Sequence, residues 1–335
     1  MARSLVIRAD ADARIGIGHT MRCLALAQAW IDADKGSVWL ASTNVTGEVR
    51  GRYEREGVRV LHIDAEPRDI CRVVRQTGAS WVALDGYAFG LAEQGAIEAS
   101  GARSLVIDDD GAAGEYVADL VVDPNVFATP ASYERRSART RLLLGPRYAL
   151  LRRELRGRPA RRLEPPRRVL VTFGGADPAD FTLTALQAVI SLSVEAIIVV
   201  GPANQRHEEL KRASQGARNV RLVWDAPDMR ALIDDCDVAI AAAGGTCLEL
   251  AHAGVPQIVA VAAANQRRVA EGLVREGLAL SLGGAGAVTA SGMREMLASL
   301  LADASARADM AARGPVLVDG DGPARVVAQM VEPYV

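Results

Sequence analysis

Short apolar segments alternate with helix-like segments along this chain, and the alternation occurs twice. In the first half, strands are predicted at 5–8, 38–41, 60–63, 81–84, 104–107 and 120–122, with helices at 19–33, 67–76 and 90–99. Strands that alternate with helices of this length are typical of a parallel sheet covered on both faces. The alternation therefore predicts an α/β fold.

The second half repeats the pattern after a break. The segment 152–168, RRELRGRPARRLEPPRR, is dense in arginine and proline, and proline ends helices and strands because it lacks the amide donor. Strands are predicted at 168–173, 195–200, 219–223, 237–241 and 256–261, with helices near 180–190, 205–213, 227–235, 246–253 and 266–275. The sequence thus predicts two Rossmann-like, doubly wound domains facing a cleft, at 1–152 and 168–318. A linker at 153–167 joins them, and a helix within 319–335 can pack back on the first domain.

Composition excludes several classes of protein. The net charge is −2 and both signs are interspersed outside the arginine-rich linker, which argues against a nucleic-acid partner. No window approaches 18 uncharged apolar residues, so no integral membrane segment is predicted. The four cysteines lack metal or redox spacing and are interpreted as buried thiols of a cytoplasmic protein.

A histidine follows a glycine turn at the start of the first long helix. In the segment 13–30, ARIGIGHTMRCLALAQAW, Gly16 and Gly18 lie between a strand and a helix that begins near His19. The positive end of a helix disfavours a charged imidazolium, and a general base must be neutral. His19 is therefore the leading candidate for a catalytic base, although a capping or packing role is also open.

Other polar residues follow predicted strands of the first half. Asp85 and Tyr87 come directly after the strand 81–84, at the carboxyl edge of the predicted sheet, and Asp85 is a candidate to contact a substrate. The alternatives are a turn cap for Asp85 and an ordinary half-buried aromatic for Tyr87. Three acids at 108–110 follow another strand, and consecutive residues there point in different directions. We interpret them as solvated loop acids and predict no metal site.

Glycine turns also follow strands of the second half. Gly244 and Gly245 precede a helix that Thr246 can cap and whose free amides attract phosphate. Glu249 is equally consistent with a capping box and with a ribose ligand. Gly174 and Gly175 form a similar turn, in which the glycines can serve only the turn and Asp177 can cap the next helix. Asn265 and Gln266 follow a third strand, with an N-cap as the alternative for Asn265. No Gly-Lys-Ser or Gly-Lys-Thr follows either turn, which disfavours a nucleoside triphosphatase.

Taken together, these motifs resemble the PseG/SpsG family, which includes a UDP-sugar hydrolase of pseudaminic acid biosynthesis and spore-coat polysaccharide proteins and is related in fold to MurG. The resemblance rests on IRADADARIGIGHTMRCLALAQAW, LDGY, LLLGPRYALLRREL, VTFGGADP, AGGTCLELAHAGVPQIV and AANQ, which occur in order across nearly the whole chain. It implies a GT-B fold with UDP held mainly by the second domain. It also implies a reaction that needs neither metal nor other cofactor.

The resemblance also implies roles for individual residues. His19 corresponds to the catalytic histidine, and Arg22 is the arginine of the same Gly-His-x-x-Arg motif. Tyr87 and Asn265 match active-site residues of the family. Glu249 corresponds to the ribose-binding glutamate. The turn 244–246 is expected to hold the diphosphate, and the segment 224–229, beginning at Trp224, is expected to face uracil.

The chain departs from the family at two places. Family hydrolases often have histidine, serine or asparagine at the position of Gly86, and a basic residue near 110–113, where this chain reads Asp-Gly-Ala-Ala. The leading hypothesis is hydrolysis of a UDP-linked amino sugar with inversion. The alternatives are transfer of the sugar to a small acceptor and a non-catalytic nucleotide-sugar-binding subunit. A dehydrogenase is disfavoured because the third glycine of the dinucleotide-binding fingerprint is absent after Gly-Ile-Gly-His. An epimerase is disfavoured because the additional acid and base groups that it needs are not found in the sequence.

Overall fold

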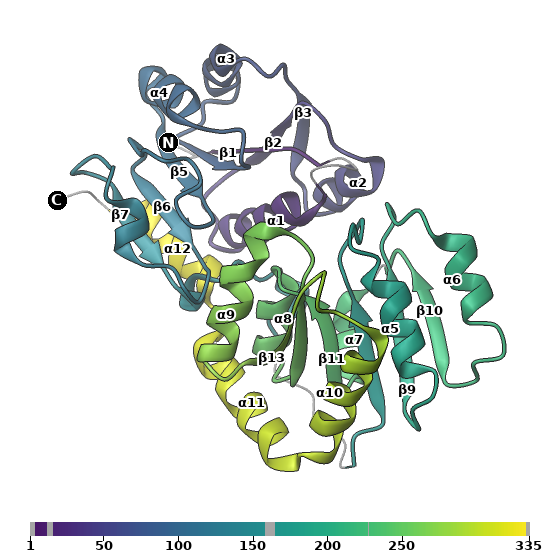
Figure 1. Ribbon diagram of the computed structural model, residues 1–335. Helices are drawn as coiled ribbons and strands as arrows, with labels where there is room; N and C mark the ends of the chain where they lie inside the picture. The colour runs from purple at the N-terminus through teal and green to yellow at the C-terminus, as the bar shows by residue number, and fades with distance from the viewer. Residues whose placement is uncertain (1–3, 12–15, 158–164, 227, 333–335) are drawn as a thin grey trace. The chain divides into compact units, whose positions relative to one another are not determined.

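The chain forms two compact units. The computed structural model describes residues 4–11, 16–157, 165–226 and 228–332. Unit 1 comprises Met1–Arg153 and Gly320–Val335, and unit 2 comprises Glu154–Asp319 (Figure 1). The C-terminal segment therefore belongs to the same unit as the N-terminal half of the chain. The predicted linker lies partly outside the described residues, and a short 3₁₀ turn, Arg153–Leu155, occupies its start.

Unit 1 is built on a sheet of seven parallel strands. In chain order they are β1 (Leu5–Ala9), β2 (Val38–Ser42), β3 (Arg59–His62), β4 (Trp81–Asp85), β5 (Arg103–Ile107), β6 (Leu120–Asp123) and β7 (Arg141–Leu144). Their spatial order is β3-β2-β1-β4-β5-β6-β7. The strand order reverses between β1 and β4, and ligands of such sheets bind at the carboxyl ends of the strands beside this point.

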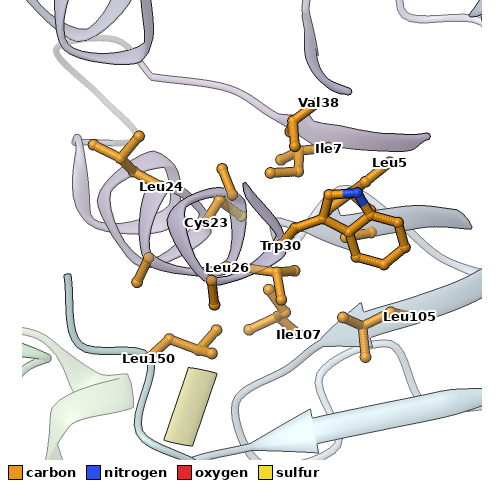
Figure 2. Packing of buried hydrophobic residues seen from close by; sticks show 14 of the residues in the cluster. Leu5, Ile7, Cys23, Leu24, Leu26, Trp30, Val38, Leu105, Ile107 and Leu150 are labelled. Carbon is orange, nitrogen blue, oxygen red and sulfur yellow. The ribbon is translucent and has the colours of Figure 1, made fainter. Parts of the chain in front are cut away.

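Helices cover both faces of this sheet. They are α1 (Gly18–Asp32), α2 (Gly47–Arg55), α3 (Pro67–Thr77), α4 (Leu91–Ser100) and α12 (Gly322–Val331). Leu5 and Ile7 of β1 belong to the core formed with α1 and α12, whereas Val6 belongs to the core formed with α3 and α4. Figure 2 shows Leu26 and Trp30 of α1 directed towards the strands. Helix α1 is buried almost all round because the sheet and α12 both pack against it.

Unit 2 has a sheet of six parallel strands. They are β8 (Arg168–Thr172), β9 (Glu195–Val200), β10 (Val220–Trp224), β11 (Val238–Ala242), β12 (Gln257–Val261) and β13 (Ala279–Gly284), in the order β10-β9-β8-β11-β12-β13. The helices are α5 (Phe181–Val189), α6 (His207–Ala213), α7 (Met229–Asp235), α8 (Thr246–His252), α9 (Arg267–Arg275), α10 (Ala290–Ala302) and α11 (Ala304–Leu317). The strand order reverses between β8 and β11, so the two glycine turns predicted to bind anions flank this point.

The predicted α/β class and two doubly wound sheets are confirmed, and the predicted strands and helices lie within a few residues of those observed. The strands and helices predicted from the sequence do not include α2, β7, β13, α10 and α11. Helix α2 is mostly charged and buries only Val49 and Tyr53, so its apolar signal is weak. The helix predicted within 319–335 is α12, whose Val326, Val327 and Met330 lie in the unit 1 core.

The close approach of β9 to the turn after β8 gives a stability prediction. A Cβ on Gly201 would lie 2.3 Å from the carbonyl oxygens of Gly174 and Gly175, whereas a Cβ on Gly175 would meet open space. Because backbone atoms cannot move aside locally, we expect Gly201→Ala to lower the free energy of unfolding by about 2 kcal/mol or more. Gly175→Ala is the matched control, with a change within about 0.5 kcal/mol. Urea unfolding measures both, and equal effects would contradict the packing account.

Candidate active site

His19 lies in the first turn of α1, beside the point where the strand order of unit 1 reverses. Its Nδ1 is 2.6 Å from Oδ1 of Asp85, the last residue of β4. The side chain of His19 is 11% exposed, and that of Asp85 is fully buried. Strands β1 and β4 are paired neighbours, and the start of α1, the helix that follows β1, lies at the edge where β4 ends.

The contact with Asp85 defines the tautomer of the imidazole. A carboxylate only accepts hydrogen bonds, so the short Nδ1 contact makes Nδ1 the donor. The neutral ring then carries its lone pair on Nε2, the nitrogen that can accept a proton. A histidine held in this way by a buried carboxylate is the base-and-orienter pair of acid–base catalysis.

Arg22 holds Asp85 in place from the next turn of α1. Its Nε lies 2.6 Å from Oδ2 of Asp85 and its Nη2 lies 2.7 Å from Oδ1, a two-pronged contact. The same guanidinium reaches Asp109 with Nη1 at 2.9 Å and Nη2 at 3.2 Å. The thiol of Cys23 donates to Oδ2 of Asp85 at 3.3 Å. Asp85 therefore has two donors on each oxygen.

Arg22 keeps both carboxylates ionised. Burial alone would raise the pKa of Asp85, but the charge and hydrogen bonds of Arg22, together with His19, hold that pKa below its usual value. Burial likewise opposes ionisation of Asp109, and Arg22 and Asn125 lower its pKa to about 2. Burial and the charge of Asp85 raise the pKa of the Cys23 thiol well above its usual value, so this thiol is protonated.

Tyr87 and Asn125 complete the cluster around Asp109. The Tyr87 hydroxyl donates to Oδ2 of Asp109 at 3.1 Å, and Nδ2 of Asn125 donates to Oδ1 at 3.1 Å. The ring of Tyr87, 56% exposed, meets the imidazole of His19 edge-on with centroids 5.1 Å apart. A pocket opens beside these groups, lined by His19, Arg22, Gly86, Tyr87, Phe89, Val106, Ile107, Asp108, Asp109, Ala112 and Ala113.

Two interpretations drawn from the sequence of unit 1 are wrong. The acids 108–110 are not solvated loop acids: Asp108 accepts from the Ala112 amide and the Tyr116 hydroxyl, Asp109 pairs with Arg22, and Asp110 accepts from Ser132. Asp85 is neither a turn cap nor placed to contact a ligand, because its carboxylate is fully buried on His19, Arg22 and Cys23.

Gly86 has a structural reason to be glycine in this chain. Its φ is +153°, and a Cβ there would lie 3.0 Å from the ring of Phe89. That ring is covered by the guanidinium of Arg8, 4.6 Å from its centroid. A larger residue at position 86 would have to displace this packed pair. Gly16, with φ +78°, and Gly18, the first residue of α1, both face open space.

In the turn after β8, the side chain of Asp177 takes the place that an anion would occupy at the start of α5. Both oxygens of buried Asp177 accept from the first amides of α5, those of Phe181 and Thr182, at 3.0 and 2.8 Å. The capping role considered for Asp177 is thus confirmed. Gly174 and Gly175 form the tight turn against which Gly201 packs, and Asp177 already satisfies the amides of Phe181 and Thr182.

The turn after β11 is more open. Gly244 and Gly245 have open space where a Cβ would stand. Gly245 is the N-cap of α8 and Thr246 is its first helical residue, so the expected side-chain cap by Thr246 is wrong. Glu249 then lies one position beyond that of a capping-box acid, and its capping-box interpretation is not supported.

The remaining predicted residues lie on the same edge of the unit 2 sheet, where all six parallel strands end. Trp224 ends β10, and its ring packs against His207 of α6 with centroids 4.6 Å apart. Asn265 is exposed in a 3₁₀ turn, Ala264–Gln266, and the N-cap of α9 is Gln266 rather than Asn265. The Gln266 side chain accepts from the Ala262 amide at 2.9 Å and so closes its own turn.

The described residues contain no group of three or more His, Cys, Asp or Glu side chains placed to hold a metal ion. Within the same part of the chain, every helix is too short or too polar to cross a membrane.

Comparison of sequences gives two curated relatives. No protein-family model matches the chain. It is 25% identical over 270 residues to the uncharacterized protein MJ1062 of Methanocaldococcus jannaschii, covering 76% of this chain and 55% of that protein. It is 27% identical over 172 residues to the spore coat polysaccharide biosynthesis protein SpsG of Bacillus subtilis, covering 50% of this chain and 51% of SpsG. The chain thus spans about half the length of the curated relatives it matches, and the similarity to SpsG confirms the resemblance carried by the motifs.

Comparison of structures identifies the fold. MurG of Acinetobacter baumannii superposes with a TM-score of 0.69 at 18% identity, covering 98% of this chain and 99% of MurG. HepE of Anabaena, solved in complex with UDP-glucose, superposes with a TM-score of 0.67 at 12% identity, covering 98% of this chain and 99% of HepE. The fold is that of the GT-B glycosyltransferases, as predicted.

The shared guanidinium gives a prediction about stability and pH. Arg22→Met would leave two buried carboxylates without their cation, and we expect a loss of about 3 kcal/mol or more at pH 7. Asp85 and Asp109 have lowered pKa values, so their stabilisation is present above their unfolded value of 3.8 and is lost as the pH falls towards about 2. The difference between wild type and variant should therefore shrink in acid.

Urea unfolding between pH 3 and pH 7 measures this difference. Arg153→Met is the matched control, because Arg153 pairs with Asp32 and Glu56 on the surface of the same unit. We expect it to cost no more than about 1 kcal/mol. A cost for Arg22→Met that is independent of pH would contradict the assigned ionisation of the two acids.

Proposed function

We propose that this chain cleaves the anomeric C–O bond of a UDP-sugar and releases UDP, with water as the nucleophile and inversion at the anomeric carbon. The observation that carries the proposal is the His19–Asp85 contact, which fixes Nδ1 as donor and leaves Nε2 to accept a proton. The motifs shared with the PseG/SpsG family and the similarity to SpsG support a nucleotide-sugar substrate. The UDP-glucose bound by HepE, a protein of the same fold, is consistent with that substrate.

Each residue of the unit 1 cluster has a defined part in the proposed step. Nε2 of His19 takes a proton from the attacking water as the oxygen bonds to the anomeric carbon and the bond to UDP breaks. Asp85 stabilises the imidazolium that forms and keeps the ring in its orientation. Arg22 positions Asp85, and Tyr87 packs against the ring edge.

We further propose that unit 2 holds the UDP moiety. The open turn of Gly244, Gly245 and Thr246 would receive the diphosphate, with Glu249 at the ribose, and Trp224 begins the segment proposed to face uracil. Asn265 and Gln266 would contribute amides at the same sheet edge. No metal ion or other cofactor takes part in this proposal, because the proton transfer and the binding of the leaving group are assigned to protein groups.

Sugar transfer is the second candidate function. The solved structures that share this fold include the glycosyltransferase VinC, and transfer would use the same base on an acceptor hydroxyl or ring nitrogen. Mass spectrometry of products from a panel of UDP-sugars, with and without acceptors, distinguishes the two. Rapid UDP release without any acceptor supports hydrolysis, and release that requires an acceptor supports transfer.

Variants of the dyad test the assignment of the base. We expect His19→Ala to lower kcat by about 10²–10⁴ while the Kd for UDP stays within twofold, because a base acts on the reaction and not on nucleotide binding. Asp85→Asn should cause a loss of similar order, since an amide can hold the wrong tautomer. His62→Ala, at an exposed histidine of the same unit, is the control. Full turnover by His19→Ala would end the proposal for this residue.

The stereochemistry of the product is a separate test. Direct attack by water on the face opposite UDP gives a first-formed sugar of inverted anomeric configuration. Proton NMR during the first minutes of the reaction reports that anomer before mutarotation. Retention of configuration would require a covalent intermediate and would exclude direct attack by a water activated by His19.

A further inference from the structure

The pocket beside His19 is surrounded by more negative than positive charge. Arg22 contributes one positive charge, whereas the two carboxylates it pairs with, Asp85 and Asp109, contribute two negative charges. A third acid, Asp108, also lines the pocket. The Asp109 side chain is 23% exposed, so its field reaches the pocket directly. With His19 neutral, as a base must be, the cluster has a surplus of negative charge.

Arg22 has little capacity left to bind an anionic group. Four of its five N–H groups already point at carboxylate oxygens of Asp85 and Asp109. Recognition of an incoming carboxylate or phosphate by arginine uses two parallel N–H groups, and Arg22 cannot supply such a pair without releasing one of its own acids.

Among the other described residues that line the pocket, none carries a positive charge. Phe89, Val106, Ile107, Ala112 and Ala113 are apolar. Behind Phe89 lies Arg8, but its guanidinium is paired with Asp10 at 2.6 Å. An anion entering this pocket would therefore lose its hydration and meet repulsion.

The charge balance of the proton transfer points the same way. A neutral nucleophile gives its proton to His19. The imidazolium that forms then cancels the one negative charge left over when Arg22 is set against Asp85 and Asp109. A carboxylate or phosphate oxygen acting as the nucleophile has no proton to give, so it would leave the His19–Asp85 pair without a function. An acceptor that attacks through a hydroxyl but also bears such an anionic group would add its negative charge to the surplus.

We propose that the pocket of unit 1 selects an uncharged nucleophile with a transferable proton, such as water, a hydroxyl or a heterocyclic N–H, and excludes carboxylate- and phosphate-bearing acceptors. This inference rests on the proposed function. It restricts the co-substrate at His19 and makes no statement about the charge of the sugar that is transferred.

The first test compares glycerol with glycerate, which differ by one carboxylate. Each is added at equal concentration to wild-type protein with the UDP-sugar that releases UDP fastest, at ionic strength matched with sodium chloride. We expect free sugar or the glycerol adduct as product by mass spectrometry. The glycerate adduct should amount to no more than about a tenth of these products, and glycerate should inhibit UDP release no more than glycerol does.

The second test changes the charge of the pocket wall. Ala112 is exposed at the pocket, so a longer side chain can be accommodated there. Ala112→Lys adds a cation, and Ala112→Gln is its uncharged control of similar length. We expect glycerate to inhibit UDP release, or to appear in product, at least about tenfold more with Ala112→Lys than with Ala112→Gln.

The outcomes are distinguishable. A glycerate adduct as abundant as the glycerol adduct in wild type, or equal responses of the lysine and glutamine variants, would overturn the charge selection while the proposed function stands. Absence of UDP release from every UDP-sugar in the wild-type protein would overturn the proposed function itself.

Discussion

The site in unit 1 depends on a single guanidinium shared by two carboxylates. Arg22 spans the ends of β4 and β5 by pairing with the fully buried Asp85 and the partly buried Asp109, and it stabilises both acids as anions. The orientation of His19 follows from this arrangement, because the imidazole hydrogen-bonds to the same Asp85 oxygen that Arg22 Nη2 contacts. Helix α1 supplies both the histidine and the arginine, three residues apart, so one helix face positions the base and its support together.

Packing of α1 explains why this arrangement can be rigid. The helix is covered by the sheet and by α12, and its residues from Cys23 to Trp30 are buried. Its first turn lies at the point where the strand order reverses, the place where a parallel sheet leaves its strand ends uncovered. Unit 2 has the same strand order up to its sixth strand, and its open glycine turn after β11 lies at the corresponding point. One topology thus brings polar groups to the sheet edge in both units.

The sequence predicts much of this because its signals are local. Alternating apolar segments locate most strands, and the glycine turn before His19 marks a strand end followed by a helix. The partners of the histidine are harder to predict, because Asp109 and Asn125 follow β5 and β6 and reach the site only through strand pairing. Three successive acids suggested solvent exposure, yet each accepts hydrogen bonds from a different element. Knowing that the strands are parallel and ordered β1-β4-β5 would have brought Asp85 and Asp109 to one edge.

The turns of unit 2 show how similar sequences can serve different ends. Both have paired glycines between a strand and a helix, but the turn after β8 is followed by Asp177, whose carboxylate takes the helix amides that an anion would need. The turn after β11 has Thr246 instead, and no acidic side chain precedes its helix. At the start of α8 the amides of Cys247 and Leu248 donate instead to the carbonyls of Gly244 and Gly245, so backbone hydrogen bonds close this turn where a side chain closes the other. A glycine pair between a strand and a helix therefore does not by itself indicate an anion site, because the residues after it can satisfy the helix amides.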